Sequence, residues 1–78
     1  MAMKDLLEYL AGELLGSSEG VEVKVRSGRH SVTLDLYLPA EEAGKVIGRN
    51  GRVIRAVRDV LGVVAARENK RVHLEVHS

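Results

Sequence analysis

The stretch GKVIGRNGRVIRAV, residues 44–57, places a glycine on either side of the pair Arg49 and Asn50. Aliphatic pairs flank both glycines, and the apolar residues that follow Gly51 recur at helical spacing. A glycine readily takes the left-handed backbone conformation that ends a helix, and a second one lets the chain reverse into the next helix. The stretch therefore predicts two helices joined by a tight, exposed bend.

The remaining segments follow two simple periodicities. Apolar residues at every third or fourth position predict helices, and strict alternation of apolar and polar residues predicts strands. Pro39 ends the second strand and can open the following helix, because the first helical turn needs no amide donor there. In chain order, the expected elements are a helix ending at Gly16, strands over 21–26 and 31–38, helices over 39–47 and 52–66, and a strand over 71–77.

This order, α-β-β-α-α-β, predicts an α+β fold. Each strand has one apolar and one polar face, so helices should cover one face of the sheet and water the other. The short turn over 27–30 favours an antiparallel hairpin, and the two-helix crossover is long enough for a parallel pairing of the second and third strands. We expect one domain over residues 1–78, with a three-stranded mixed sheet and three helices on one face.

Several kinds of chemistry lack the residues they need. There is no cysteine, so neither a disulfide nor a thiolate site can form. His73 and His77 share a strand face but stand roughly 13 Å apart at about 3.3 Å per residue, too far to bind one ion. No serine sits in a nucleophile elbow, and the glycines lack the spacing of a triphosphate-binding loop. We expect no catalytic residue, no metal site, no cofactor and no small-molecule substrate.

The chain also lacks the signals of a membrane or secreted protein. No apolar run approaches the roughly 20 residues that span a bilayer. The start MAMKDLLEYL carries an acid where a signal peptide would carry basic residues. We therefore expect a cytoplasmic protein with no membrane partner.

Positive charge is concentrated around the glycine bend. Residues 45–58 hold five basic side chains and no acid, although the whole chain has a formal net charge of only +1. The N-terminus of a helix favours anions, so arginines clustered there are unfavourable until an anion binds. The five residues are Lys45, Arg49, Arg52, Arg55 and Arg58, and their position predicts a phosphate-bearing partner at one place on the molecule.

The core of this stretch, VIGRNGRVI, resembles the VIGxxGxxI signature of the KH (K-homology) RNA-binding domain. In that family the G-x-x-G loop clamps the backbone of about four nucleotides. A helix and a strand ahead of a β-α-α-β core at about 31–77 resemble the type II arrangement, and the whole chain is similar to the KhpA family of small, stand-alone bacterial KH proteins. The resemblance implies non-catalytic binding of single-stranded RNA by a post-transcriptional regulator or RNA chaperone. It also implies a homodimer, or pairing with a larger KH partner called KhpB in some bacteria.

Carried over residue by residue, the resemblance implies a set of RNA-binding positions. The far rim of the family's binding groove would be the turn over 27–30, whose shortness predicts weak base selectivity. With no Phe or Trp, bases would meet aliphatic side chains rather than an aromatic platform. The implied residues are Gly48, Arg49, Asn50 and Gly51 for the clamp, Lys45, Arg52 and Arg55 for charge around it, Ile47, Ile54 and Leu74 for the groove lining, and Arg29 for the rim.

Alternatives remain open for each of these features. The two glycines could serve only a tight turn between helices, and the arginine row could be a solvated helix face. The chief functional alternative is a protein–protein interaction module, a homodimer or a complex with a KhpB-like partner, in which RNA contact is secondary. The sequence also does not separate RNA from single-stranded DNA, because no residue visibly reads a 2′-hydroxyl.

Overall fold

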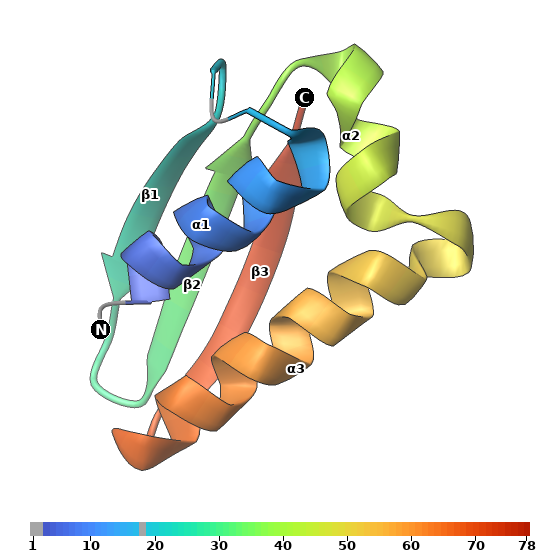
Figure 1. Cartoon of the computed structure of the whole chain (residues 1–78). Coiled ribbons are helices and arrows are strands. Elements are labelled where there is room, and N and C mark those ends of the chain that lie inside the picture. Colours follow the sequence, from blue (N-terminus) through green and yellow to red (C-terminus); the bar gives the residue numbers. More distant parts are fainter. Residues whose placement is uncertain (1–2, 18) are drawn as a thin grey trace.

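A computed structural model describes residues 3–17 and 19–78 of the chain. The expected element order α-β-β-α-α-β, which is that of the type II KH fold, is confirmed (Figure 1). The elements are α1 (Met3–Leu15), β1 (Glu22–Ser27), β2 (Ser31–Tyr37), α2 (Ala40–Ile47), a single 3-10 turn η1 (Arg49–Gly51), α3 (Arg52–Arg67) and β3 (Arg71–His77).

The sheet is mixed, with strand order β1-β2-β3. β1 runs antiparallel to β2, and the pairing extends from Glu22 opposite Tyr37 to Ser27 opposite Val32. β3 runs parallel to β2, starting with Arg71 opposite Ser31. The hairpin and the helical crossover expected from the sequence are both confirmed, and β2 lies in the centre.

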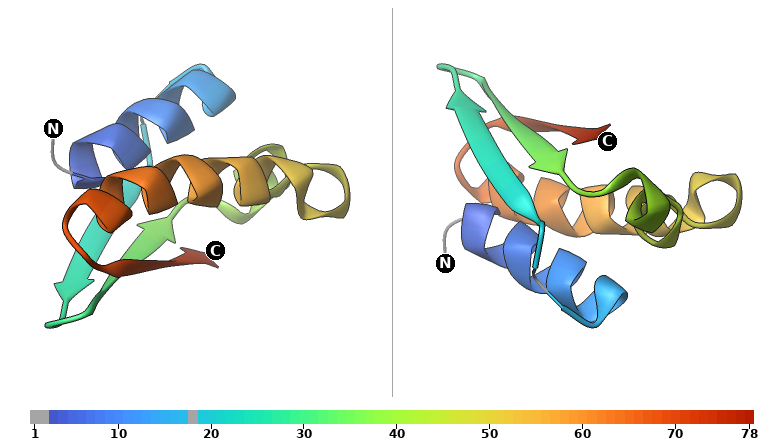
Figure 2. Two further views of the ribbon diagram at one scale, coloured as in Figure 1. Left: turned by 90° about the horizontal axis from the view of Figure 1, so that it is seen from below. Right: turned by 90° about the horizontal axis from the view of Figure 1, so that it is seen from above.

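All three α-helices lie on one face of the sheet, as both views of Figure 2 show. The core between them is aliphatic, and alternate residues of β2 point into it. Leu34 and Leu36 are fully buried there, as is Leu61 of α3. Among the described residues, no helix is long and apolar enough to cross a membrane.

Several element boundaries differ from the expectation by one residue, and two differences have a clear physical cause. Pro39 lies just outside α2 as its N-cap, and its carbonyl oxygen accepts the amide of Glu42 at 2.9 Å, so the helix begins one residue later. Val25 was expected on the covered face of β1, yet it is 43% exposed. Its inward direction is right, but α1 and α3 leave a hollow over that end of the sheet.

Candidate nucleic-acid interface

The bend between α2 and α3 depends on backbone conformations that favour glycine. Gly48 ends α2 at φ 75° and ψ 174°, a region that is essentially restricted to glycine. After one 3-10 turn, Gly51 is left-handed at φ 72°. Asn50 between them is also left-handed, at φ 56°, which asparagine tolerates better than most residues.

The two glycines differ in how much space surrounds them. A Cβ on Gly48 would overlap the side chain of Val53 and lie 3.0 Å from its amide nitrogen. A Cβ on Gly51 would meet only Cγ2 of Ile54, at 3.8 Å. The fold alone therefore accounts for both glycines, and the residues between and around them are the ones left to bind RNA at the bend.

Part of the loop's hydrogen-bonding capacity is already used internally. The amide of Gly48 donates to the carbonyl oxygen of Gly44 at 2.8 Å, and the amide of Gly51 donates to that of Gly48 at 3.2 Å. The amide of Arg52 donates to the carbonyl oxygen of Arg49. Within the loop, the amides of Arg49 and Asn50 are therefore the ones left for a phosphate to bind.

Arg55 is tied to the loop itself. Its Nη2 donates a hydrogen bond to the backbone carbonyl oxygen of Asn50 at 3.0 Å. This bond joins the first turns of α3 to the one non-glycine residue that adopts a left-handed conformation in the bend. Arg55 therefore supports the loop's shape as well as its charge.

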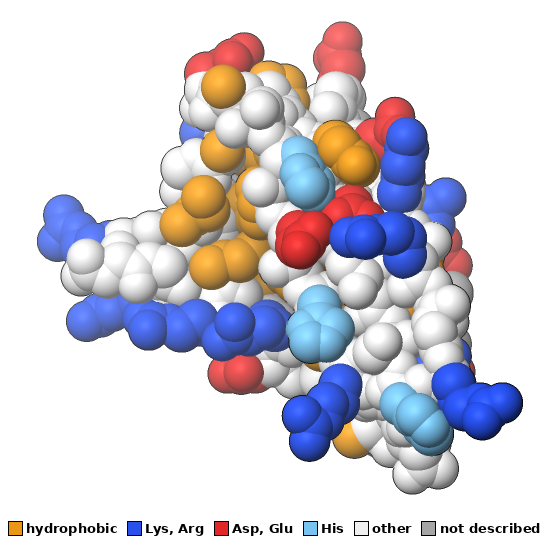
Figure 3. Space-filling model, turned by 180° about the vertical axis from the view of Figure 1, so that it is seen from behind, with side chains coloured by type: hydrophobic (Ala, Val, Ile, Leu, Met, Phe, Trp, Pro, Cys, Tyr) orange, Lys and Arg blue, Asp and Glu red, His pale blue; other side chains and the backbone are white. Residues whose placement is uncertain are grey.

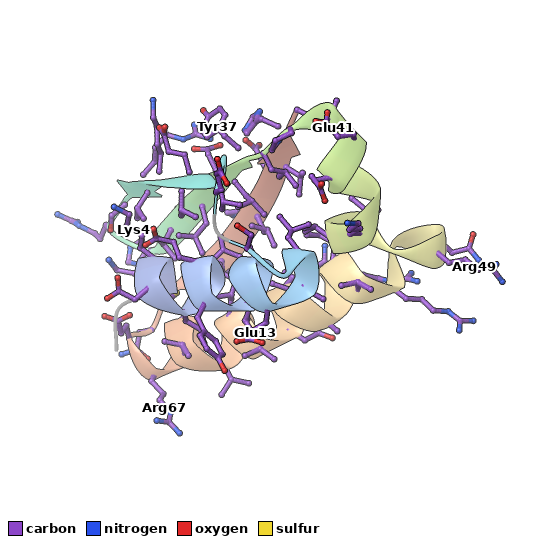
Figure 4. All side chains as sticks on the ribbon, turned by 45° about the horizontal axis from the view of Figure 1, so that its top comes forward. Lys4, Glu13, Tyr37, Glu41, Arg49 and Arg67 are labelled. Carbon is purple, nitrogen blue, oxygen red and sulfur yellow. The ribbon has the colours of Figure 1, made fainter. Side chains whose placement is uncertain are left out.

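The other basic residues point in different directions. Arg49 projects from the tip of the bend into solvent (Figure 4). Lys45 lies 3.1 Å from a carboxylate oxygen of Glu42, so part of its charge is neutralised. Arg52 lines a hollow on the α1 side of α3. Within the part of the chain that the structure describes, no carboxylate lies in ion-pairing range of Arg49, Arg52, Arg55 or Arg58.

The three residues expected to line the groove, here called the aliphatic strip, come from elements that adjoin one another. The strip consists of Ile47, which is 38% exposed, and the half-buried residues Ile54 and Leu74, and they come from α2, α3 and β3. α3 contacts both α2 and β3, so the three elements adjoin. Seen from behind, hydrophobic side chains gather beside the line of basic side chains that runs toward the loop (Figure 3).

Arg29 lies far from this assembly. Its turn is fastened to the start of β3, because the amide of Arg71 donates to the carbonyl oxygen of His30 at 2.9 Å. The 16-residue helix α3, about 24 Å long, separates that end of the molecule from the glycine bend. The structure does not bring Arg29 together with the loop, and its role in binding stays a prediction.

Sequence reasoning missed a polar network on the outer face of the sheet. Asp35 is only 4% exposed although its strand position faces solvent. Arg26 binds both of its carboxylate oxygens, Nε to Oδ2 at 2.9 Å and Nη2 to Oδ1 at 3.1 Å, and His77 Nε2 lies 2.9 Å from Oδ1. The pairing of Asp35 with Glu75 in the sheet register could have indicated such a cluster.

The negative charge of this network is partly balanced by Arg26. Ligand atoms of Asp35, Glu75 and His77 lie within 4.8 Å of one another, which would suit a metal ion. However, Arg26 also binds Glu75, at 3.1 Å, so a guanidinium already supplies the cation. The hydrogen bonds from Arg26 and then His77 lower the pKa of Asp35 to about 2. The cluster is accounted for as a structural ion-pair network.

Comparison with known proteins shows which family the chain belongs to. The family model "KhpA/KhpB, KH domain" matches residues 4–76. This chain belongs to the KhpA/KhpB KH-domain family. The chain is 42% identical over 74 residues to "RNA-binding protein KhpA" of Clostridium acetobutylicum, covering 95% of this chain and 99% of that protein. Proteins of the same name from Borreliella burgdorferi and Aquifex aeolicus are each 39% identical; they cover 92% and 96% of this chain, and 88% and 95% of their own lengths.

Proposed function

We propose that this KH domain binds single-stranded RNA without catalysis and that its glycine loop contacts the sugar–phosphate backbone. The observation that carries the proposal is the exposed pair Arg49–Asn50, held on a projecting bend in an acid-free stretch of the chain. The printed names of the relatives, RNA-binding protein KhpA, support the same partner. Consistent with the family, the protein would act in the cytoplasm as a post-transcriptional regulator or RNA chaperone.

The binding mode follows from the loop geometry. A phosphate would meet the guanidinium of Arg49 and the amides of Arg49 and Asn50, while Lys45 and Arg52 add positive potential. Gly48 and Gly51 set the shape of the bend, and Arg55 holds it through the Asn50 carbonyl.

Bases would lie along the aliphatic strip of Ile47, Ile54 and Leu74. Without an aromatic stacking platform, such contacts are shallow, so we expect weak base preference. Arg29 could add a contact only if the bound strand continued to the opposite end of β3.

The double variant Arg49→Asp with Asn50→Asp tests the proposal. Both side chains are exposed, and aspartate tolerates the left-handed conformation of Asn50, so the fold should survive. Filter binding to single-stranded RNA should be abolished while the circular dichroism spectrum is retained. Lys24→Glu with Ser78→Asp makes the same change in net charge away from the loop and should bind like wild type. Undiminished binding by the folded loop variant would refute the proposal.

A second candidate function, a protein-interaction module, is favoured by the opposite side of α3. A hollow of about 380 Å³ between α1 and α3 is lined almost entirely by apolar side chains, among them Leu10, Leu14 and Val60. The same two helices also carry exposed large hydrophobic side chains, Tyr9 of α1 at 62% and Val63 of α3 at 61%. Exposed apolar patches of this kind often mark interfaces with proteins. A second copy or a KhpB-like partner is the occupant that family membership suggests.

Nuclease treatment separates the two candidates. If the apolar face binds a protein, a pull-down of its partner should survive complete digestion of RNA. The variant Val60→Glu should abolish that contact while leaving RNA binding at the loop intact, since Val60 faces α1 rather than the aliphatic strip. Loss of the contact on nuclease treatment would mean that RNA bridges the two proteins.

A further inference from the structure

A second hollow lies at the end of the molecule farthest from the glycine bend. It has a volume of about 430 Å³ and is formed where α1 begins, where α3 ends and where the β1–β2 turn begins. Its floor is apolar and includes Val25, Val32 and Val64, from β1, β2 and α3. Val25 is 43% exposed because nothing in the described residues covers it.

Cations dominate the charged side chains around this floor. Lys4, Arg67 and Lys70 line the hollow against a single carboxylate, that of Glu68. Lys70 Nζ donates to the hydroxyl oxygen of Ser27 at 3.0 Å, which holds the ammonium group at the wall. In the described ranges, no carboxylate lies within ion-pairing distance of Lys4 or Arg67.

Lys4 is the most informative of the three cations. Arg67 stands in the last turn of α3, where the helix dipole favours a positive charge for structural reasons alone. Lys4 stands in the first turn of α1, where the dipole disfavours one. An anion bound in the hollow would relieve that conflict and would be attracted by all three cations.

The hollow is distinct from the loop site. Lys4 and Arg67 lie at one end of the molecule and Arg49 projects at the other (Figure 4). The length of α3, about 24 Å, separates the two sites. A nucleotide or two held at the loop cannot reach the hollow, but a longer strand can.

We propose that this hollow is a second contact site for single-stranded RNA, with Lys4, Arg67 and Lys70 on its phosphates and the valine floor against a base. The inference rests on the proposed function, because it assumes that RNA is the polyanion the protein meets. The hollow combines three cations with an apolar floor, which fits a nucleotide better than it fits a purely apolar ligand. A strand that occupies both sites would run along the length of α3 from one end of the molecule to the other.

RNA length and salt dependence test the inference. Oligouridylates of about four nucleotides match the footprint of one KH loop. Even at the roughly 3.4 Å per nucleotide of one strand in a stacked duplex, a 20-mer spans roughly 68 Å, twice the 34 Å longest dimension of the molecule, and can reach both sites. The hollow variant is Lys4→Gln with Arg67→Gln. The matched control, Lys24→Gln with Arg71→Gln, removes the same charge from the outer face of the sheet.

Affinity is measured by fluorescence anisotropy over a range of salt concentrations. For the hollow variant, the slope of log K against log salt on the 20-mer should become shallower by about 1.4, two lost phosphate contacts at about 0.7 each. Its binding to the four-nucleotide RNA should not change. The control should match wild type on both RNAs, and circular dichroism should show all variants folded.

Two outcomes would overturn the inference. One is a hollow variant that matches the control on the 20-mer, and the other is a wild-type protein that binds neither RNA. A failure of the proposed function can be distinguished from a failure of this inference. If Arg49→Asp with Asn50→Asp leaves binding of both RNAs intact, the loop is not the main site, while the hollow variant still decides whether the second site exists.

Discussion

Gly48 meets two requirements that no residue with a side chain can meet together. Its backbone lies in a glycine-only region, and the side chain of Val53 fills the space where a Cβ would be. Gly51 meets neither in full, since its backbone is in the left-handed region that other residues can enter at a cost, and the space around it is open. Substitutions at the two glycines should therefore differ in severity, although the signature treats them alike.

We expect Gly51→Ala to lower the free energy of unfolding by about 1–2 kcal/mol, the cost of a left-handed alanine. Gly48→Ala should cost clearly more, above about 2 kcal/mol, because overpacking against Val53 adds to backbone strain. Urea unfolding followed by circular dichroism measures both values. Equal losses for the two variants would contradict the packing argument. Because substitutions at either glycine should destabilise the fold, variants of Arg49 and Asn50 test RNA binding more directly.

Arg55 gives a second prediction at the residue scale. Its hydrogen bond to the Asn50 carbonyl makes it a positioning residue, so Arg55→Gln should weaken RNA binding by loosening the loop. The salt slope should stay close to that of wild type, whereas a lost phosphate contact would reduce it by about 0.7. The Asn50 amide resonance should also shift in the RNA-free variant.

Arg58→Gln is the matched control for this test. It removes the same charge one helical turn further along α3, where no contact with the loop is present in the described residues. Its Asn50 amide resonance should therefore stay in place. A reduced slope in Arg55→Gln with an unmoved amide would show that Arg55 contacts RNA directly.

At the scale of elements, Asp35 joins all three strands through side chains on the outer face. Arg26 comes from β1, Asp35 from β2, and His77 and Glu75 from β3. The ring of Tyr37 stacks on His77 at 4.7 Å between centroids. The charge of one carboxylate therefore contributes to holding the sheet together.

The pH dependence of stability follows from this arrangement. The pKa of Asp35 is lowered from 3.8 to about 2, chiefly by Arg26, so folding favours the ionised form. This stabilisation is complete above about pH 4 and is lost as the pH falls toward 2. Asp35→Asn should be less stable than wild type at pH 7, and the gap should close on acidification. Urea unfolding at several pH values measures it, with exposed Asp59→Asn as control; a gap independent of pH would contradict the prediction.

Most of the element-scale structure could be predicted because it depends on local patterns. Alternation placed Leu34 and Leu36 in the core, and the short turn and long crossover fixed the strand directions. The burial of Asp35 could not be predicted in the same way. It depends on Arg26 and His77, which lie nine and 42 residues away in the sequence and meet it only in the folded sheet.

At the scale of the whole molecule, basic side chains stand at both ends of α3, with Arg52 and Arg55 in its first turns and Arg67 in its last. If about two to four phosphates are neutralised at the loop, binding of a short single strand should show a log–log salt slope of about −1.4 to −2.8. Anisotropy measurements on a four-nucleotide RNA would give this slope. A flat response would exclude the basic loop as the main source of affinity.

The candidate site was predictable in composition but not in arrangement. The motif located the loop, yet residues spaced three apart on a helix turn progressively around it. Arg52 therefore faces the α1 side while Arg55 reaches the loop, although the sequence suggested one common face. Likewise, the position of Arg29 depends on which end of α3 the hairpin turn reaches, and that is a property of the assembled sheet.

The parallel pairing of β2 with β3 also determines the order in which the sheet can form. Ser31 pairs with Arg71, 40 residues later. The chain between them, including α2 and α3, must therefore be in place before these two strands can pair. The β1–β2 hairpin alone is a two-stranded ribbon, which is marginal in water. During synthesis, one edge of the central strand should therefore remain unpaired until residues 71–77 have left the ribosome. A chaperone that binds unpaired strand edges would act on the chain during that interval.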